Sequence, residues 1–171
     1  MKQTTIISAT ILALSLSGQA MADAGHGKGA PIGEPGKANA VDRVIEVSMD
    51  EMKFEPSNIS VKEGETIKFV VSNDGNIIHE FNLGTSEMWK SHNSEMLKML
   101  NNGMMTMKKI NHDKMMKAGM MHDEPNSVLL APGETGEVIW KFSEAGELGF
   151  ACNVPGHFEA GMVGEVTFEG H

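Results

Sequence analysis

Three side chains that commonly bind metals stand close together near the end of the sequence. Cys152, His157 and Met162 follow one another at the spacing C-x4-H-x4-M, with the turn-forming pair Pro155-Gly156 between the first two. A strand that ends at Cys152, a turn at the Pro-Gly pair and a second strand that starts at Met162 would bring a thiol, an imidazole and a thioether together. This short segment therefore predicts a loop that supplies three ligands to one metal ion.

A fourth candidate ligand, His79, lies far upstream in the apolar stretch Ile77-Ile78-His79-Glu80-Phe81. Two imidazoles, one thiolate and a weak axial thioether form the donor set of a blue-copper (type 1) electron-transfer site. The thiolate and the thioether favour Cu(I), and the imidazoles suit both oxidation states. Zinc is an alternative at His79, Cys152 and His157, although a thioether is not a usual zinc ligand. The donor set therefore indicates one type 1 copper per chain.

Each of the four residues also has an ordinary structural explanation. A single cysteine is commonly a small buried apolar residue, and a histidine or a methionine in an apolar segment can simply fill the core. The sequence has one cysteine, so it cannot form an internal disulfide. In an oxidising compartment a free thiol is prone to oxidation, and this favours a metal-bound Cys152.

The start of the chain predicts export. Lys2 precedes an apolar run, and Ala20-Met21-Ala22 is typical of a secretory cleavage site, so residues 1–22 predict a signal peptide. The apolar run is too short to cross a membrane as a helix, and no membrane insertion is expected. Residues 23–41 are rich in Gly, Ala and Pro, and they predict a flexible leader that docks loosely or not at all.

Residues 42–171 have the length of one domain, and their pattern is that of β-strands. Apolar residues alternate with polar ones at a two-residue period in several short segments that are separated by turn sequences. These segments lie at residues 45–49, 59–61, 67–71, 138–142, 148–152 and 162–168, and with the apolar stretch around His79 they indicate seven or eight strands. Because no helices alternate with the strands, the pattern predicts an all-β fold, an antiparallel β-sandwich with Greek-key connections.

Residues 85–124 break this rhythm and predict a helical insertion between His79 and Cys152. Ser86 can cap a helix in which Met88, His92, Met96 and Met99 share one stripe, and Trp89, Leu97 and Leu100 form a packing face beside it. A second helical stretch follows Gly103, with His112, Met116 and Met120 on one stripe.

This insertion holds ten of the 15 methionines of the chain. Thioethers are soft donors that do not titrate, so the cluster predicts additional Cu(I) binding in an exported compartment. The alternative is that methionine fills an irregular apolar core. The candidate accessory ligands are Met96, Met99, Met104, Met105, Met107, His112, Met115, Met116, Met120 and Met121.

These residues and their spacing resemble the cupredoxin family, and the ligand loop resembles the azurin-like spacing more than the shorter plastocyanin one. The resemblance extends from about Val41 through Lys62-Glu63-Gly64-Glu65-Thr66 and His79-Glu80-Phe81 to the loop at residues 154–162. Over this range the sequence resembles the small periplasmic cupredoxins of copper tolerance. The resemblance implies a periplasmic Greek-key sandwich whose type 1 copper is held by His79, Cys152, His157 and Met162. Glu80 is a departure, because many electron-shuttling members have at this place an Asn that ties the ligand strands together.

Charge and missing motifs narrow the functions that remain. A formal net charge of −9 argues against a nucleic-acid partner, because phosphate neutralisation needs a basic face. The sequence shows no supported Ser-His-Asp set, no phosphate-binding glycine loop and no second constellation of the multicopper-oxidase kind, so no enzyme is expected.

Three functions are left, and the first is favoured. The first is copper tolerance, with copper ions as the ligand and a redox or copper-transfer protein as a partner. The second is a diffusible one-electron carrier between periplasmic redox partners. The third is an oxidase of Cu(I), which would require an electron acceptor. A carrier needs only the four ligands, so the clustered methionines favour copper tolerance.

Overall fold

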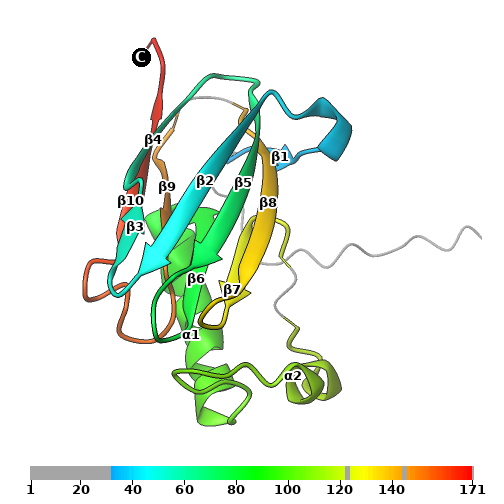
Figure 1. Cartoon of the computed structure of the whole chain (residues 1–171), viewed down its shortest axis with the longest axis vertical. Coiled ribbons are helices and arrows are strands. Elements are labelled where there is room, and N and C mark those ends of the chain that lie inside the picture. Colours follow the sequence, from blue (N-terminus) through cyan, green and yellow to red (C-terminus); the bar gives the residue numbers. More distant parts are fainter. Residues whose placement is uncertain (1–31, 122–123, 144–145, 171) are drawn as a thin grey trace, which may run out of the picture.

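Two five-stranded β-sheets pack face to face in the computed structural model, which describes residues 32–121, 124–143 and 146–170 (Figure 1). In spatial order the first sheet consists of β1 (Glu34–Pro35), β8 (Thr135–Lys141), β5 (Thr66–Asn73), β2 (Arg43–Asp50) and β3 (Lys53–Glu55). The second sheet consists of β4 (Asn58–Val61), β10 (Val163–Phe168), β9 (Leu148–Ala151), β6 (His79–Gly84) and β7 (Ser127–Leu130). The all-β sandwich predicted from the sequence is confirmed.

Aromatic side chains fill the space between the two sheets. Phe54 of the first sheet packs edge to face against Phe150 of the second, with ring centroids 5.0 Å apart, and Phe81 lies 5.2 Å from Phe150. Phe69 and Trp140 are fully buried in the same core. Such close-packed interiors deform little, so the sandwich is a rigid support for the loops at its ends.

Two strand pairs are parallel, which differs from the purely antiparallel sandwich that the sequence suggested. β2 runs parallel to β5, and β10 runs parallel to β4. The two-residue alternation reports which face of a strand is buried, and it carries no information on the direction of the neighbouring strand. The remaining pairs of the two sheets are antiparallel.

The segment before β2 is held against the first sheet from Ile32 onward, so the prediction of a loosely docked leader is wrong for the described part of residues 23–41. Ile32 is buried, and its carbonyl oxygen accepts a 2.8 Å hydrogen bond from Nε1 of Trp140. β1 then pairs with β8. A buried indole needs an acceptor for its N–H, and this need ties the segment down. The expected signal peptide, residues 1–22, lies outside the described residues.

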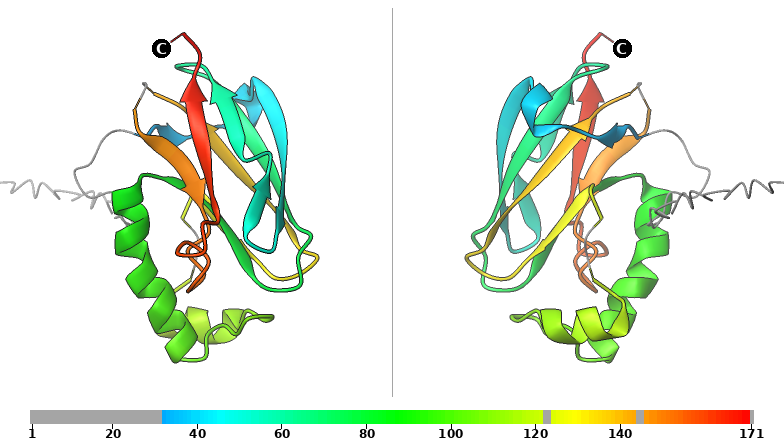
Figure 2. Two further views of the ribbon diagram at one scale, coloured as in Figure 1. Left: turned by 90° about the vertical axis from the view of Figure 1, so that its left-hand side faces the viewer. Right: turned by 90° about the vertical axis from the view of Figure 1, so that its right-hand side faces the viewer.

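The helical insertion between β6 and β7 is confirmed, and it contains α1 (Ser86–Asn101) and α2 (His112–Ala118). Thr85, rather than Ser86, caps α1, because its side chain accepts a hydrogen bond from the backbone N–H of Met88. Gly119 caps the C-terminal end of α2, and its φ of 65° is the left-handed conformation that glycine adopts easily. Figure 2 shows α1 running along the side of the sandwich and α2 lying beneath the end that carries the β9–β10 loop.

Candidate metal centre

A thiol and two imidazoles meet inside one end of the sandwich. Sγ of Cys152 lies 3.2 Å from Nδ1 of His157 and 3.9 Å from Nδ1 of His79. The ring centroids of the two histidines are 5.0 Å apart, and all three residues are buried. Their candidate ligand atoms lie within 4.8 Å of one another, a separation that a single ion can bridge.

The loop between β9 and β10 supplies two of these side chains and carries the fourth candidate, Met162. The backbone N–H of Cys152 donates to the carbonyl of Met162 at 3.1 Å, and the N–H of Met162 donates to the carbonyl of His157 at 3.0 Å. Gly156 makes the turn with a φ of 93°. Met162 is fully buried in the same apolar cluster as Cys152. The loop therefore closes on itself in the way that the C-x4-H-x4-M spacing predicted.

His79 begins β6, and the preceding turn is clamped by residues that were not predicted from the sequence. The side-chain amide of Asn73 donates to the carbonyls of Ile77 and Leu130, at 2.8 Å each. Gly75 leaves room for the imidazole, since a Cβ at this position would lie 3.1 Å from Nε2 of His79. The pair Asp74-Gly75 is a turn signal, and it was the available hint that the chain bends before His79.

Burial changes the proton affinities of the candidate ligands. It raises the pKa of Cys152 to about 12, and the negative charge of Glu80 acts in the same direction. Burial, together with the neighbouring His79, lowers the pKa of His157 to about 4, and burial also lowers the pKa of His79. At neutral pH both imidazoles are therefore neutral and can donate a lone pair, whereas the thiol keeps its proton until a metal displaces it.

The donor atoms fit copper, and ordinary core packing does not explain them. Nε2 of His79 and Nε2 of His157 are buried and have no hydrogen-bond partner among the described residues. Buried polar atoms are almost always hydrogen-bonded, so a structural hydrogen-bond network does not account for these two nitrogens. Their Nδ1 atoms both face a thiol sulfur, and this combination of two imidazoles with a soft sulfur suits a copper ion.

The ten candidate accessory residues of the insertion fall into buried and exposed sets. Met96, Met99, Met104, Met105 and Met115 are buried, Met120 is half-buried, and Met107, His112, Met116 and Met121 are exposed. The buried methionines belong to the same apolar cluster as the core of the sandwich. Methionine adapts well to such irregular interfaces, so these five side chains pack the insertion against the sandwich.

The insertion also contacts the elements that carry the candidate ligands. The N–H of Ile78, the residue before His79, donates to the carbonyl of Met107 at 2.7 Å. On the other side, the Asn93 amide of α1 donates to the Glu159 carboxylate at 3.2 Å, in the loop between Cys152 and Met162. The insertion is therefore attached to both chain segments that build the metal centre.

A β-sandwich that encloses a thiol and two imidazoles beside a buried methionine at one end defines a cupredoxin. The family model of copper-binding proteins of the plastocyanin/azurin family matches residues 41–169, and the chain belongs to this family.

Relatives and solved structures agree with this assignment. The chain is 41% identical over 175 residues to the copper-resistant cuproprotein CopI of Pseudomonas aeruginosa, a match that covers 96% of this chain and 97% of the relative. It is also 41% identical over 161 residues to the protein of the same name from Rubrivivax gelatinosus, covering 86% and 87%. Auracyanin B is a structural neighbour with a TM-score of 0.58 and 20% identity, covering 80% of this chain and 95% of auracyanin B, and it supports the fold.

Proposed function

We propose that the chain is a periplasmic copper-tolerance protein that holds one type 1 copper between His79, Cys152, His157 and Met162. The observation that carries the proposal is the buried thiol sulfur with an imidazole Nδ1 at 3.2 Å and another at 3.9 Å. The CopI relatives, named copper-resistant and matched over most of the chain, support a role in copper tolerance. Copper in such a site supplies a Cu(II)/Cu(I) couple.

The residues of the chain would prepare the site before the metal arrives. His79 and His157 stay neutral at pH 7, because burial lowers the pKa of each imidazole. Cys152 would bind copper as a thiolate, so its thiol proton would leave on binding. The backbone hydrogen bonds of the β9–β10 loop hold Cys152 close to Met162, and they do not depend on the metal. Little movement of the ligands is then needed when one electron is gained or lost.

That rigid loop favours a second candidate function, a diffusible one-electron carrier between periplasmic redox partners. Against it stands the insertion, which lies at the ligand end of the sandwich (Figure 2). His157 is buried, with 1% of its surface exposed. Electron transfer slows steeply with distance, so a layer of protein over this end suits copper handling better than rapid exchange with a partner. No enzymatic activity is part of the proposal, and the partner protein is not assigned.

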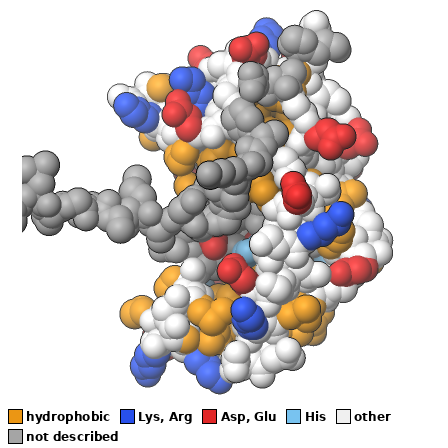
Figure 3. All heavy atoms as spheres, turned by 180° about the vertical axis from the view of Figure 1, so that it is seen from behind, with side chains coloured by type: hydrophobic (Ala, Val, Ile, Leu, Met, Phe, Trp, Pro, Cys, Tyr) orange, Lys and Arg blue, Asp and Glu red, His pale blue; other side chains and the backbone are white. Residues whose placement is uncertain are grey.

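The exposed methionines of the insertion are proposed as accessory Cu(I) ligands. Met107, Met116 and Met121 are 42%, 63% and 39% exposed, and His112, the first residue of α2, is also exposed. Figure 3 shows hydrophobic and basic side chains together at the end of the molecule that the insertion builds. Soft thioethers that face water can take up Cu(I) without unfolding the core. In the described part of the chain, neither helix is long and apolar enough to span a membrane.

The ligand assignment is tested by substituting its two sulfur residues in the copper-loaded protein. Cys152→Ser should abolish the visible thiolate-to-copper charge-transfer band. Met162→Leu should keep the band and raise the reduction potential, because the site loses an electron-donating ligand and becomes more apolar, which disfavours the higher charge of Cu(II). Met49→Leu, another fully buried methionine, is the matched control and should leave the potential unchanged. A coloured Cys152→Ser protein would refute the assignment.

Copper stoichiometry separates the two candidate functions. Under reducing, anaerobic conditions the parent should bind several Cu(I) per chain, of which one becomes coloured on oxidation. Replacing Met107, Met116 and Met121 together by leucine should leave the colour intact and lower the Cu(I) capacity by about one ion per chain. A parent that binds a single copper, with no loss of capacity in the triple variant, would favour the electron carrier.

A further inference from the structure

Glu80 is a fully buried carboxylate beside the metal centre. It directly follows His79 in β6 and has no exposed surface. Its backbone N–H donates to Sγ of Cys152 at 3.3 Å. A buried carboxylate is unfavourable unless it is both hydrogen-bonded and compensated by a positive charge, so its partners show what keeps it there.

One carboxylate oxygen ties the two ligand segments together. Oε2 of Glu80 accepts hydrogen bonds from the backbone N–H of Asn153 at 3.0 Å and from its side-chain amide at 2.9 Å. Asn153 is the residue after Cys152, so Glu80 links the strand of His79 to the loop of Cys152. Glu80, which replaces the Asn of many electron-shuttling cupredoxins, therefore cross-links the two segments through a group that carries a negative charge.

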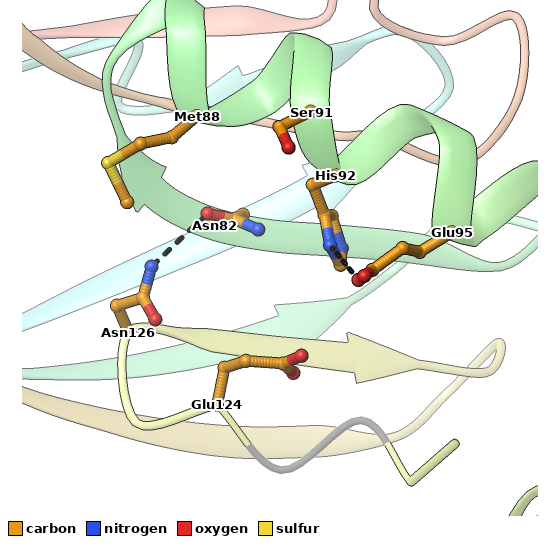
Figure 4. A pocket seen from close by; sticks show the side chains of 7 residues that line it. All are labelled: Asn82, Met88, Ser91, His92, Glu95, Glu124 and Asn126. Carbon is orange, nitrogen blue, oxygen red and sulfur yellow. Dashed lines mark hydrogen bonds and ion pairs between the residues drawn. The ribbon is translucent and has the colours of Figure 1, made fainter. Parts of the chain in front are cut away.

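The other oxygen faces the insertion. Oε1 of Glu80 lies 3.0 Å from Nε2 of His92, and it also accepts a hydrogen bond from the Asn82 side chain at 3.3 Å. His92 comes from α1, with 13% of its side chain exposed, and its Nδ1 lies 3.5 Å from a carboxylate oxygen of Glu95. Figure 4 shows the imidazole between the helix and β6, with Glu95 next to it. Because both ring nitrogens face carboxylates, the arrangement suits an imidazolium with two N–H donors.

We infer that His92 is a positioning residue for the metal centre. Its contact with Glu80 compensates the buried negative charge, and Glu80 in turn holds the Cys152 loop against β6. The helical insertion is thereby coupled to the copper through His92 and Glu80, and it tunes the reduction potential and the colour of the site. This inference rests on the proposed function, because it concerns the copper that His79, Cys152, His157 and Met162 would hold.

The test compares His92→Gln and His92→Phe with the parent, each loaded with one copper. Glutamine keeps a polar N–H and removes the charge, whereas phenylalanine removes both. Each variant should lower the reduction potential, because removal of the His92 charge leaves more of the negative charge of Glu80 to act on the copper, and this charge stabilises Cu(II) relative to Cu(I). His92→Phe should also shift the visible bands and the copper hyperfine splitting, since the Cys152 loop loses its support. Lys90→Gln, an equal loss of charge at an exposed position of the same helix, is the control and should change neither quantity.

A double-mutant cycle with Glu80→Gln identifies the route of the effect. Glutamine at this position keeps an oxygen acceptor for Asn153 and carries no charge, so adding His92→Phe to it should change the potential much less than in the parent. Equal effects in both backgrounds would overturn the route through Glu80. If both His92 variants match the parent in potential and spectrum, the inference fails while the proposed function stands. If the parent itself binds no coloured copper, the proposed function fails and the inference fails with it.

Discussion

At the level of single residues, the position of His79 depends on a neighbour that has no side chain. A Cβ at Gly75 would lie 2.9 Å from a carboxylate oxygen of Glu51 and 3.1 Å from Nε2 of His79. Glu51 is exposed and can move away, but His79 is fully buried among packed groups. An added methyl group would therefore displace the imidazole, and the tight packing around it would resist the displacement.

Gly75→Ala should perturb the copper site without removing any ligand. We expect a shifted visible spectrum in the copper-loaded protein and a loss of about 1–3 kcal/mol in the free energy of unfolding, which is typical of overpacking. Visible absorption and urea denaturation measure the two effects. Gly146→Ala is the control, because a Cβ there meets no atom within 4 Å. An unchanged spectrum in Gly75→Ala would show that the turn before His79 adapts freely.

The short spacing along the chain made three of the candidate ligands predictable. The residues that hold these ligands in place could not be predicted. Cys152, His157 and Met162 lie in one loop, so the distance along the chain already limits their distance in space. Glu80 and His92 lie on different elements, and only the packing of α1 against β6 brings their side chains to 3.0 Å. No pattern in the sequence encodes that packing angle, so the contact between His92 and Glu80 could be found only in three dimensions.

At the level of elements, Trp89 anchors α1 to the second sheet. Its Nε1 donates to the carbonyl of Asn82 at 3.2 Å, and its ring lies 6.0 Å from Phe158 in the ligand loop. Two strand glycines make room for the indole, since a Cβ at Gly84 would lie 2.9 Å from Nε1 and a Cβ at Gly149 would lie 3.2 Å from Cη2. The indole therefore packs closely against the sheet at two positions that have no Cβ.

Trp89→Ala should detach α1 from the sandwich. Loss of a buried indole typically costs about 3–5 kcal/mol, and the amide protons of α1 should then exchange faster than those of the sheets. Hydrogen exchange and denaturation of the metal-free protein measure these effects. Leu97→Ala, at a position of the same helix that is 43% exposed, should cost about 1 kcal/mol or less. Equal protection of α1 in parent and Trp89→Ala would mean that other contacts hold the helix.

A visible period, more than length alone, decided whether the sequence could predict an element. The long alternating strands β2, β5 and β8 were predicted, because several consecutive periods define a face. β3 has three residues, too few for a period to show, and β7 has the sequence Ser-Val-Leu-Leu, which does not alternate; neither was predicted, whereas β4 and β9, with four residues each, were. The stripe on α2 was also misplaced, because Met115 is buried while Met116 is 63% exposed. Seven residues make about two turns, which leaves the buried face of such a helix undefined.

At the level of the whole molecule, folding encloses three titratable groups that the unfolded chain exposes to water. The sandwich and the loop bury His79, Cys152 and His157 before any metal binds. Burial favours the neutral form of each group, so the folded and unfolded chains bind different numbers of protons. The free energy of unfolding of the metal-free protein must therefore depend on pH. It must be highest at intermediate pH and decrease at both lower and higher pH.

The direction of each change follows from the two pKa values involved. On the acid side, the unfolded chain protonates His157 near its ordinary pKa of 6.5, whereas the folded chain does so only near 4. The unfolded state then binds more protons, and stability falls as the pH drops through this window. On the alkaline side, unfolded Cys152 ionises near its ordinary pKa of 9.0 and folded Cys152 only near 12, so stability falls again as the pH rises above 9.0.

Urea denaturation of the metal-free protein should therefore give the highest free energy of unfolding between about pH 6.5 and 9, with losses of about 2–3 kcal/mol at pH 4.5 and about 2 kcal/mol at pH 10.5. His157→Gln should reduce the acid loss, and Cys152→Ser should remove the alkaline one. Loading with copper provides the decisive comparison. A thiolate bound to copper has already lost its proton, so the alkaline loss should disappear in the loaded parent. If the loss persisted there, Cys152 would not be a copper ligand, because an unbound buried thiol would still resist ionisation.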